Sequence, residues 1–422
     1  MKPPMQEEME DDLAAEEENK LINEWFPDKE TPANKPYTVH RLLLGTHTSG
    51  QAQDYLQIAT VHLPKRDDSS SADRLDRADY DDERGELGGH SLPPQPRIQI
   101  IQKINHEGEV NRARYMPQNP DLIATKAVSG EIFIFDRTKH SSEPERGGVC
   151  KPDIRLVGQS KEGDINSYSK TKNVIEPTGV FRGHTSVVGD VDWHATEDYT
   201  FASVGDDKML MLYVVRLELV AYLYSHLDSW DTRDATKPAA QLQAHDREIL
   251  AVAFTPNVDF PHLILTGSSD KTIHLRDRRK LDTPVHIFEA HTDEVLHVAW
   301  SPHNPTVFAS ASSDRRINIW DISQIGVEQT PDDQEDGPPE LLFVHGGHTA
   351  RPTDFCWAPG EAESWTAGST SEDNIVMIWQ PTMRIWAGDE VKIDEKELEG
   401  EAMEGIEMID NEADDGAGPA TA

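Results

Sequence analysis

The chain has 422 residues and a formal net charge of −37, from 77 acidic and 40 basic side chains. This acidity excludes general electrostatic binding to nucleic acid, because both molecules are negative, and it favours basic partners. Two cysteines are too few for a disulfide framework, and no apolar run is long enough to span a membrane.

The first 36 residues are strongly acidic, and no signal-peptide pattern opens them. Within them, "EEENKLINEW" indicates a short helix between Met9 and Trp25. We therefore expect residues 1–36 to be an acidic tail with a truncated helix. At the other end of the chain, residues 387–422 are acidic and poor in aromatic residues, which is typical of a disordered tail.

Five stretches between these tails share one pattern. Each begins at a His, has an aromatic residue nine positions later, and continues into short alternating segments rich in Val, Ile, Ala and Ser. A repeat of about 40 residues with this pattern is typical of a four-stranded β-propeller blade. We therefore predict an all-β propeller over residues 37–386. The five first residues are His106, His184, His245, His291 and His348.

The His, Ser and Asp side chains that recur in these copies are interpreted as a structural hydrogen-bond network. The same trio in blade after blade fits a device that ties strands together, whereas catalysis would need only one copy. The sequence contains no nucleophile elbow, phosphate loop or zinc-ligand spacing. We expect no enzymatic activity, no cofactor and no metal.

The third position after the first residue of each copy is often Glu. Equivalent positions of all blades lie on one ring around a propeller axis, so these carboxylates are expected to converge on one mouth of the central channel. Such a ring suits an extended basic peptide. The alternative is a set of solvated turn carboxylates. Including a degenerate sixth copy that starts at Gln159, the column consists of Glu109, Glu162, Val187, Glu248, Glu294 and Arg351.

Longer motifs reveal a family. They include "HRLLLGTHTS" from His40, "KINHEGEVNRARYMPQNP" from Lys103, "ASSDRRINIWD" from Ala311 and "DGPPELLFVHGGHT" from Asp336. The chain resembles the histone-binding WD-repeat family, which contains the small subunit of chromatin assembly factor one, the retinoblastoma-binding proteins and the accessory subunit of type B histone acetyltransferase. The resemblance implies a WD40 β-propeller of nominally seven blades, without catalytic activity of its own.

The resemblance also implies partners and two binding surfaces. Histones H3 and H4 and the catalytic or scaffold subunits of chromatin complexes would be the partners, in the nucleus and the cytoplasm, without direct contact to nucleic acid or membrane. The histone H3 tail would bind the channel mouth through Glu109, Asn111, Glu162, Glu248, Glu294 and Glu372. A helix of histone H4 would bind a side groove between the N-terminal helix and an acidic loop at residues 330–340, through Asp333, Glu335, Asp336, Pro338, Pro339 and Leu341. Without the resemblance, that loop is only a solvated acidic insertion.

Three departures from the family pattern are expected to affect the fold. The N-terminal helix is cut short at Trp25, and the first strand of the family pattern is absent. After Gln159 about 25 residues of a blade are missing, if one blade has the usual length. Finally, residues 213–229 separate "KMLML" from the pair Trp230-Asp231, so either Tyr213 takes the place of the Trp or a loop interrupts the strand. Skipped exons and a retained intron in the gene model would explain all three.

Two other interpretations stay open at this point. Propellers of this type also serve as substrate adaptors of ubiquitin ligases, although the family motifs argue against that function. The chain is alternatively a defective isoform of the histone-binding family, because a propeller must close all round to remove its strand edges.

Overall fold

The structure is a computed structural model. It describes residues 19–32, 37–48, 50, 52–64, 80–81, 86–87, 98–116, 118–144, 148–156, 165–168, 174–175, 177–181, 183–197, 200–214, 238–331, 334, 337–360, 363–381 and 385. Every regular element longer than three residues in these ranges is a β-strand, which confirms the all-β prediction. No helix in the described part of the chain is long and apolar enough to cross a membrane.

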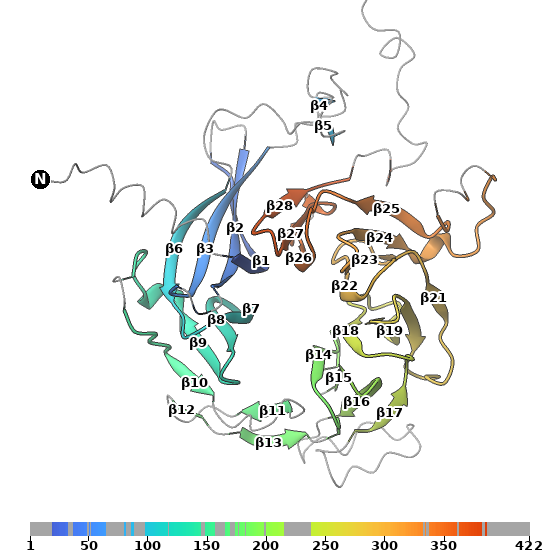
Figure 1. The fold of residues 1–422 in the computed structure, drawn as a ribbon, viewed down its shortest axis with the longest axis horizontal. Helices are drawn as coiled ribbons and strands as arrows, with labels where there is room; N and C mark the ends of the chain where they lie inside the picture. Colours follow the sequence, from blue (N-terminus) through green and yellow to red (C-terminus); the bar gives the residue numbers. More distant parts are fainter. Residues whose placement is uncertain are drawn as a thin grey trace, which may run out of the picture. The chain divides into compact units, whose positions relative to one another are not determined.

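Six sheets of three to five strands are arranged as a ring of blades within residues 19–381 (Figure 1). We number these blades 1 to 6 in chain order. In each blade the innermost strand comes first in the chain, and innermost strands of successive blades are neighbours in the order β14, β18, β22, β26, β1 and β7. The arrangement confirms a WD-type propeller.

Blades 1 and 2 come first in the chain. Blade 1 has the order β1-β2-β3-β6 and consists of β1 (Asn19–Glu30), β2 (Tyr37–His47), β3 (Tyr55–Pro64) and β6 (Ile98–Asn105). The short pair β4 (Tyr80–Asp81) and β5 (Glu86–Leu87) lies between β3 and β6 in the chain. Blade 2 has the order β12-β10-β9-β8-β7 and consists of β7 (Val110–Met116), β8 (Asn119–Ala127), β9 (Ile132–Asp136), β10 (Ile154–Leu156) and β12 (Val174–Ile175), with the 3-10 turn η3 (Arg137–Lys139) after β9.

Blades 3 to 6 are antiparallel and follow the repeat closely. Blade 3 consists of β14 (Val188–Trp193), β15 (Thr200–Gly205), β16 (Met209–Val214) and β17 (Ala240–Gln243). Blade 4 consists of β18 (Ile249–Phe254), β19 (Leu263–Ser268), β20 (Ile273–Asp277) and β21 (His286–Phe288). Blade 5 consists of β22 (Val295–Trp300), β23 (Val307–Ser312), β24 (Ile317–Asp321) and β25 (Leu341–His345), with the 3-10 turn η4 (Ile322–Gln324). Blade 6 consists of β26 (Pro352–Trp357), β27 (Ala367–Ser371) and β28 (Val376–Trp379).

The repeated His, Ser and Asp side chains form the predicted structural network. In blade 5 the Trp320 indole N–H donates to the Ser310 hydroxyl at 2.8 Å, and that hydroxyl lies 2.7 Å from Nε2 of His291. Nδ1 of His291 lies 2.9 Å from Asp314, so this nitrogen carries the proton and Nε2 accepts from the serine. Other blades repeat the network with His184, Ser203 and Asp207, and with His245, Thr266 and Asp270.

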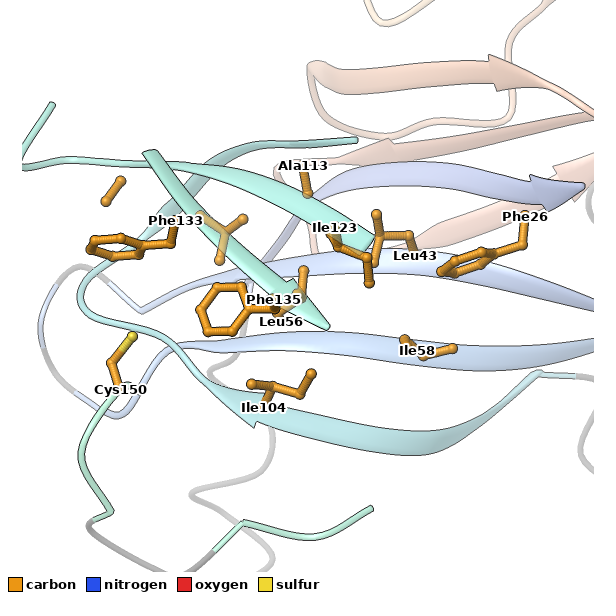
Figure 2. Close-up of a cluster of buried hydrophobic side chains, with 12 residues drawn as sticks. Phe26, Leu43, Leu56, Ile58, Ile104, Ala113, Ile123, Phe133, Phe135 and Cys150 are labelled. Carbon is orange, nitrogen blue, oxygen red and sulfur yellow. The ribbon is translucent and has the colours of Figure 1, made fainter. Parts of the chain in front are cut away.

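The apolar core lies between neighbouring blades rather than inside single sheets. Figure 2 shows one such cluster between blades 1 and 2, in which Leu43 and Ile58 meet Ile123, Phe133 and Phe135. This follows from strand geometry, because alternate side chains of a sheet point to opposite faces and each face is covered by the next blade.

The missing blade is confirmed between blades 2 and 3. Only the two-stranded sheet of β11 (Ile165–Tyr168) and β13 (Pro177–Phe181) lies there in the described part of the chain (Figure 1). Phe181 packs on Phe201 and Tyr213 of blade 3, with ring centroids 5.2 and 5.4 Å apart. Phe288, at the end of the outer strand of blade 4, makes the same kind of contact with blade 5. β13 therefore holds the place of the outer strand of a blade that otherwise contributes little.

Blade 1 corrects the expectation for the N-terminus. Residues 19–25 were expected in a helix and the first strand was expected to be absent, but both expectations are wrong: Asn19–Glu30 forms β1, the innermost strand of the blade. Trp25 and Phe26 are buried there against opposite faces of the blade. Burial in an inner strand outweighs the weak helix propensity of this stretch. Residues 9–18, the rest of the expected helix, lie outside the described residues.

Tyr213 takes the place of the blade-closing Trp in blade 3. It is fully buried, pairs with Phe201 across the sheet and stacks on it at a centroid distance of 4.7 Å. β16 continues through Val214, so the insertion placed at residues 213–229 begins structurally after Val214. Residues 215–237 lie outside the described residues.

Candidate functional site

The column at the third position after each His leads directly into the innermost strands. Val187, Glu248, Glu294 and Arg351 each precede the first residue of β14, β18, β22 and β26. Glu109 precedes β7 in the same way. All five side chains therefore start at the same end of the ring, as the sequence predicts.

One backbone hydrogen bond fixes this position in four blades. The carbonyl at the column position accepts from the N–H that directly precedes the recurring turn residue Asp207, Asp270, Asp314 or Asp373. The bonds are Asp206 N–H to Val187 at 3.0 Å, Ser269 N–H to Glu248 at 3.0 Å, Ser313 N–H to Glu294 at 2.9 Å and Glu372 N–H to Arg351 at 3.0 Å. Because the main chain is held in the same way each time, the side chains leave it at equivalent places.

The acidic column differs in its local partners from blade to blade. Glu109 is half-buried, and one of its carboxylate oxygens lies 2.9 Å from Nδ1 of His47. Glu248 and Glu294 are half-buried with no ion pair among the described residues. Glu372 is exposed and lies 3.9 Å from Arg351. Glu248 and Glu294 are thus the carboxylates best placed to take a new cation.

A cavity of about 550 Å³ opens between blades 4 and 5 beside Glu294. Its walls bring in carboxylates of Asp246 and Asp293 that the sequence prediction missed. The signal was available, because both residues follow within two positions of a repeat His. Two cations, Arg247 and Lys271, also line it, and Lys271 donates to the Thr292 carbonyl at 2.7 Å.

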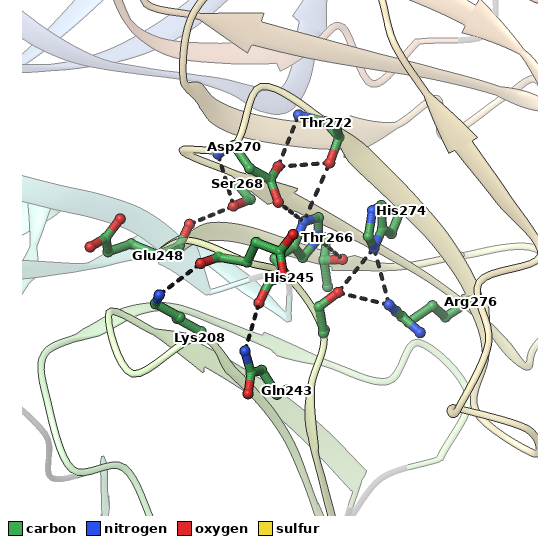
Figure 3. Close-up of polar contacts among 12 residues, drawn as sticks. Lys208, Gln243, His245, Glu248, Thr266, Ser268, Asp270, Thr272, His274 and Arg276 are labelled. Atoms are coloured by element: carbon green, nitrogen blue, oxygen red, sulfur yellow. Dashed lines mark hydrogen bonds and ion pairs between the residues drawn. The ribbon is translucent and has the colours of Figure 1, made fainter.

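The turn beside this cavity is held by a dense set of hydrogen bonds (Figure 3). The Ser268 hydroxyl donates to the Glu248 carbonyl at 2.7 Å. Burial would raise the pKa of Asp270, but hydrogen bonds from His245 and Thr272 outweigh it and hold that pKa below its ordinary value. The carboxylate of Asp270 is therefore occupied in the blade and does not belong to the binding surface.

The remaining sequence-predicted residues of the mouth are only partly brought together. Asn111 is exposed on β7, one residue after the first position of that strand. Glu162 lies outside the described residues. The sequence therefore predicted a ring of six, of which the structure places five at the starts of inner strands or in the adjacent turns.

The acidic loop at residues 330–340 is described at its end. Pro338 accepts a hydrogen bond from the Leu341 N–H at 2.9 Å, and Leu341 packs against the core cluster between blades 4 and 5. Pro339 is half-buried, and buried Glu340 lies 2.7 Å from Nε2 of His286. The loop is thus anchored where it enters β25. Asp333, Glu335 and Asp336 lie outside the described residues.

A charged cluster on inner strands was not predicted. The buried carboxylate of Asp354 on β26 lies 3.5 Å from Arg112 and 3.6 Å from Arg114, both on β7. Glu24 on β1 lies 3.9 Å from Arg114. Burial raises the pKa of Glu24 to about 7, with the Asp354 charge adding to the rise and Arg114 opposing it. The cluster links three blades through the inner wall of the ring.

These features define a WD-repeat β-propeller whose inner strands carry acidic side chains at one end. No group of three or more metal-ligating side chains is present in the described ranges. Residues 175–213, 236–277 and 282–321 match the family model "WD domain, G-beta repeat". Residues 18–65 match the family model for "Histone-binding protein RBBP4" or the corresponding subunit of the CAF1 complex.

A relative extends the similarity to most of the chain. "Histone acetyltransferase type B subunit 2" of Mycosarcoma maydis is 47% identical over 395 residues, which cover 86% of this chain and 86% of that protein. The chain therefore belongs to the histone-binding WD-repeat family.

Proposed function

We propose that this chain is a non-catalytic subunit that binds histones H3 and H4 for a chromatin complex such as type B histone acetyltransferase or chromatin assembly factor. One observation carries the proposal: Glu248 and Glu294 lie at the same step before the inner strands of adjacent blades, half-buried and without an ion pair among the described residues. Family membership and the net charge of −37 both favour a basic protein as the ligand.

The extended tail of histone H3 is the proposed ligand of the channel mouth. Its Lys and Arg side chains would approach Glu109, Glu248, Glu294 and Glu372 in turn, and Asn111 would bond to its backbone. A charge pair at 4 Å is worth roughly 4 kcal/mol at an effective dielectric of 20, before desolvation. Half-buried carboxylates lose less of this to solvent screening than exposed ones. Glu162, outside the described residues, is proposed to complete the ring.

The proposed place of histone H4 is the side groove beside the loop at residues 330–340. Pro338, Pro339 and Leu341 would supply its apolar contacts, and Asp333, Glu335 and Asp336 would hold basic side chains. Because residues 19–25 belong to β1, one wall of this groove is shorter than the family pattern requires. We therefore propose that H3 binding at the mouth is the stronger of the two contacts in this chain. A catalytic subunit, in nucleus or cytoplasm, would act on the histones so held.

The mouth is tested by charge reversal. A full chain carrying Glu248→Lys and Glu294→Lys is titrated with a fluorescent peptide of the H3 N-terminal tail. We expect at least about tenfold weaker binding than to the unaltered chain, because loss of close charge pairs costs about 1.5 kcal/mol or more. Binding to the unaltered chain should also weaken as salt is raised.

The matched control reverses two exposed carboxylates at the other end of blade 4. Asp259→Lys and Asp282→Lys change the net charge equally, but both lie in loops that follow β18 and β20, away from the mouth. Their double variant should bind the peptide within about twofold of the unaltered chain, since surface charges at a distance are screened. Equal losses in the two double variants would mean that only net charge matters, and the mouth would be rejected as the site.

A further inference from the structure

Blade 6 ends at its third strand. In blades 3, 4 and 5 a fourth strand, β17, β21 or β25, pairs with the third. The order in blade 6 is β26-β27-β28, and in the described part of the chain no strand pairs with the outer edge of β28. An edge of this kind presents backbone N–H and C=O groups to any extended chain that reaches it.

The side chains of β28 are also less covered than their counterparts. Three and five residues after the turn Asp, the third strands of blades 3 to 5 carry fully or almost fully buried aliphatic side chains. Val376 and Ile378 occupy these positions in blade 6 and are only partly buried. They share their surroundings with Leu63, Ile98 and Ile100 of blade 1, which are partly buried as well. The edge thus borders an incompletely covered apolar surface between blades 6 and 1.

β28 has none of the usual protection of an exposed edge. Natural edge strands avoid unwanted pairing through Lys, Pro or bulges. The four residues of β28 are Val, Met, Ile and Trp, and their pairing with β27 has no register shift. The strand is therefore competent to accept another.

The repeat shows which backbone groups are available. In blades 3 and 4 the carbonyl five residues after the turn Asp accepts from the segment that enters the fourth strand: Ala239 N–H to Leu212 at 2.6 Å, and Val285 N–H to Leu275 at 2.7 Å. Ile378 occupies this position in β28. In an antiparallel strand the N–H and C=O of one residue point to the same side, so Ile378 and Val376 present theirs outward.

We infer that the outer edge of β28 accepts an extended segment of a basic partner protein as the fourth strand of blade 6. The segment runs antiparallel to β28 and carries apolar side chains at alternate positions, which pack over Val376, Ile378 and the surface of Leu63, Ile98 and Ile100. Fourth strands elsewhere in the ring follow this chemistry, since Leu242 faces Leu210 and Phe288 faces Ile273. Backbone pairing supplies the affinity and the two apolar positions supply the selectivity.

Charge decides between a partner and the chain itself. Residues 1–18 and 387–422 are rich in Asp and Glu and lack alternating β-branched or aromatic residues, so neither has the chemistry of a fourth strand. A second copy brings another net charge of −37 to the same place. Repulsion between two such chains opposes self-association, whereas a basic segment is attracted. This site is distinct from the channel mouth, whose best-placed carboxylates lie in blades 4 and 5.

The test uses amide hydrogen exchange on the full chain with the synthetic peptide Lys-Val-Lys-Phe-Lys-Val-Lys as the probe. Without peptide, the amides of Val376 and Ile378 should exchange quickly, whereas those of Ile317 and Ile319, covered by β25 in blade 5, should be protected. Peptide should protect Val376 and Ile378. The same protection should appear in the Glu248→Lys, Glu294→Lys chain, in which binding at the mouth is removed.

The control peptide has the same sequence but is N-methylated at its apolar residues, which removes the N–H groups that would pair with β28. It should bind at least about tenfold more weakly, because two or three hydrogen bonds of about 1 kcal/mol each are lost. Protection of Val376 and Ile378 before any peptide is added would show that the edge is already covered and would overturn the proposal. Equal binding of both peptides, or protection elsewhere only, would overturn it too.

Discussion

Trp193 and Trp300 occupy the same position of their blades, nine residues after the repeat His, yet Trp193 is 56% exposed and Trp300 is 7% exposed. The indole N–H of Trp300 donates to the Ala253 carbonyl of the preceding blade at 3.4 Å. Trp193 faces the place where the preceding blade is missing. Val191, two residues earlier on the same face, is 37% exposed, so the loss of one blade uncovers a whole strand face.

This pair predicts unequal costs for the same substitution. Trp300→Ala should lower the free energy of unfolding by about 3–5 kcal/mol, the usual range for a buried aromatic side chain. Trp193→Ala should lower it by less than about 1.5 kcal/mol, since its main remaining contact is with Phe201. Urea denaturation of the two variants measures both values. Equal costs would mean that another segment covers Trp193.

The Asp354 cluster predicts a stability role for a buried carboxylate. Asp354→Ala leaves Arg112 and Arg114 facing each other without their shared counter-charge. The free energy of unfolding should fall by about 2–3 kcal/mol, less than for a fully buried pair because both arginines are partly exposed. Asp282→Ala, an exposed carboxylate in blade 4, should change it by no more than about 0.5 kcal/mol. Guanidinium denaturation separates the two, and similar values would show that the cluster contributes nothing.

The raised pKa of Glu24 predicts a pH dependence with a definite direction. Its folded-state pKa of about 7 lies above the ordinary value of 4.5, so the folded protein holds the proton more tightly than the unfolded chain. The resulting stability is complete below pH 4.5 and is lost as pH rises through 7. Glu24→Gln should therefore match the unaltered chain at pH 4.5 but exceed it by about 1–2 kcal/mol at pH 8. A constant difference between these pH values would contradict the assignment.

The sequence predicted those features that the repeat carries. The His–Ser–Asp network and the step at which Glu248 and Glu294 precede their strands follow from register alone, because each copy folds into the same blade. The missing blade was also visible as a register break after Gln159.

Features that depend on contacts between blades were not predictable in this way. Residues 24, 114 and 354 are far apart in the chain, and no periodicity relates them. The N-terminal stretch shows the same limit: locally it favours a helix, but pairing with β2 and burial of Trp25 make it a strand. Tyr213 was left open because a Tyr and a later Trp both fit the spacing, and only packing on Phe201 decides between them.

Use of residues 19–25 in β1 predicts impaired binding of histone H4. A peptide of the first H4 helix should bind this chain more weakly than it binds an intact family member, and the contact should be sensitive to salt because the acidic loop supplies most of it. Fluorescence titration at two salt concentrations measures this. Pro339→Ala should weaken the contact further if the loop is the remaining wall. Tight, salt-insensitive binding would show that the shortened wall is dispensable.

Deletion of residues 213–229 predicts a gain in stability. The deletion brings Trp230 to the position of Tyr213, six residues after Asp207, and so restores "KMLMLWD" to the closing strand. Loop closure itself contributes little, about 0.6 kcal/mol for each doubling of loop length. The larger effect comes from removing "VVRLELVAYL", a β-prone apolar run that favours aggregation. The melting temperature and soluble yield should rise while binding of the H3 peptide stays the same. Tyr213→Ala in the full-length chain is the matched control, because it removes the stacking partner of Phe201 without supplying Trp230, and it should cost about 3–5 kcal/mol. If the deletion lowers the melting temperature as the control does, the inserted segment stabilises the fold and is not a mere interruption.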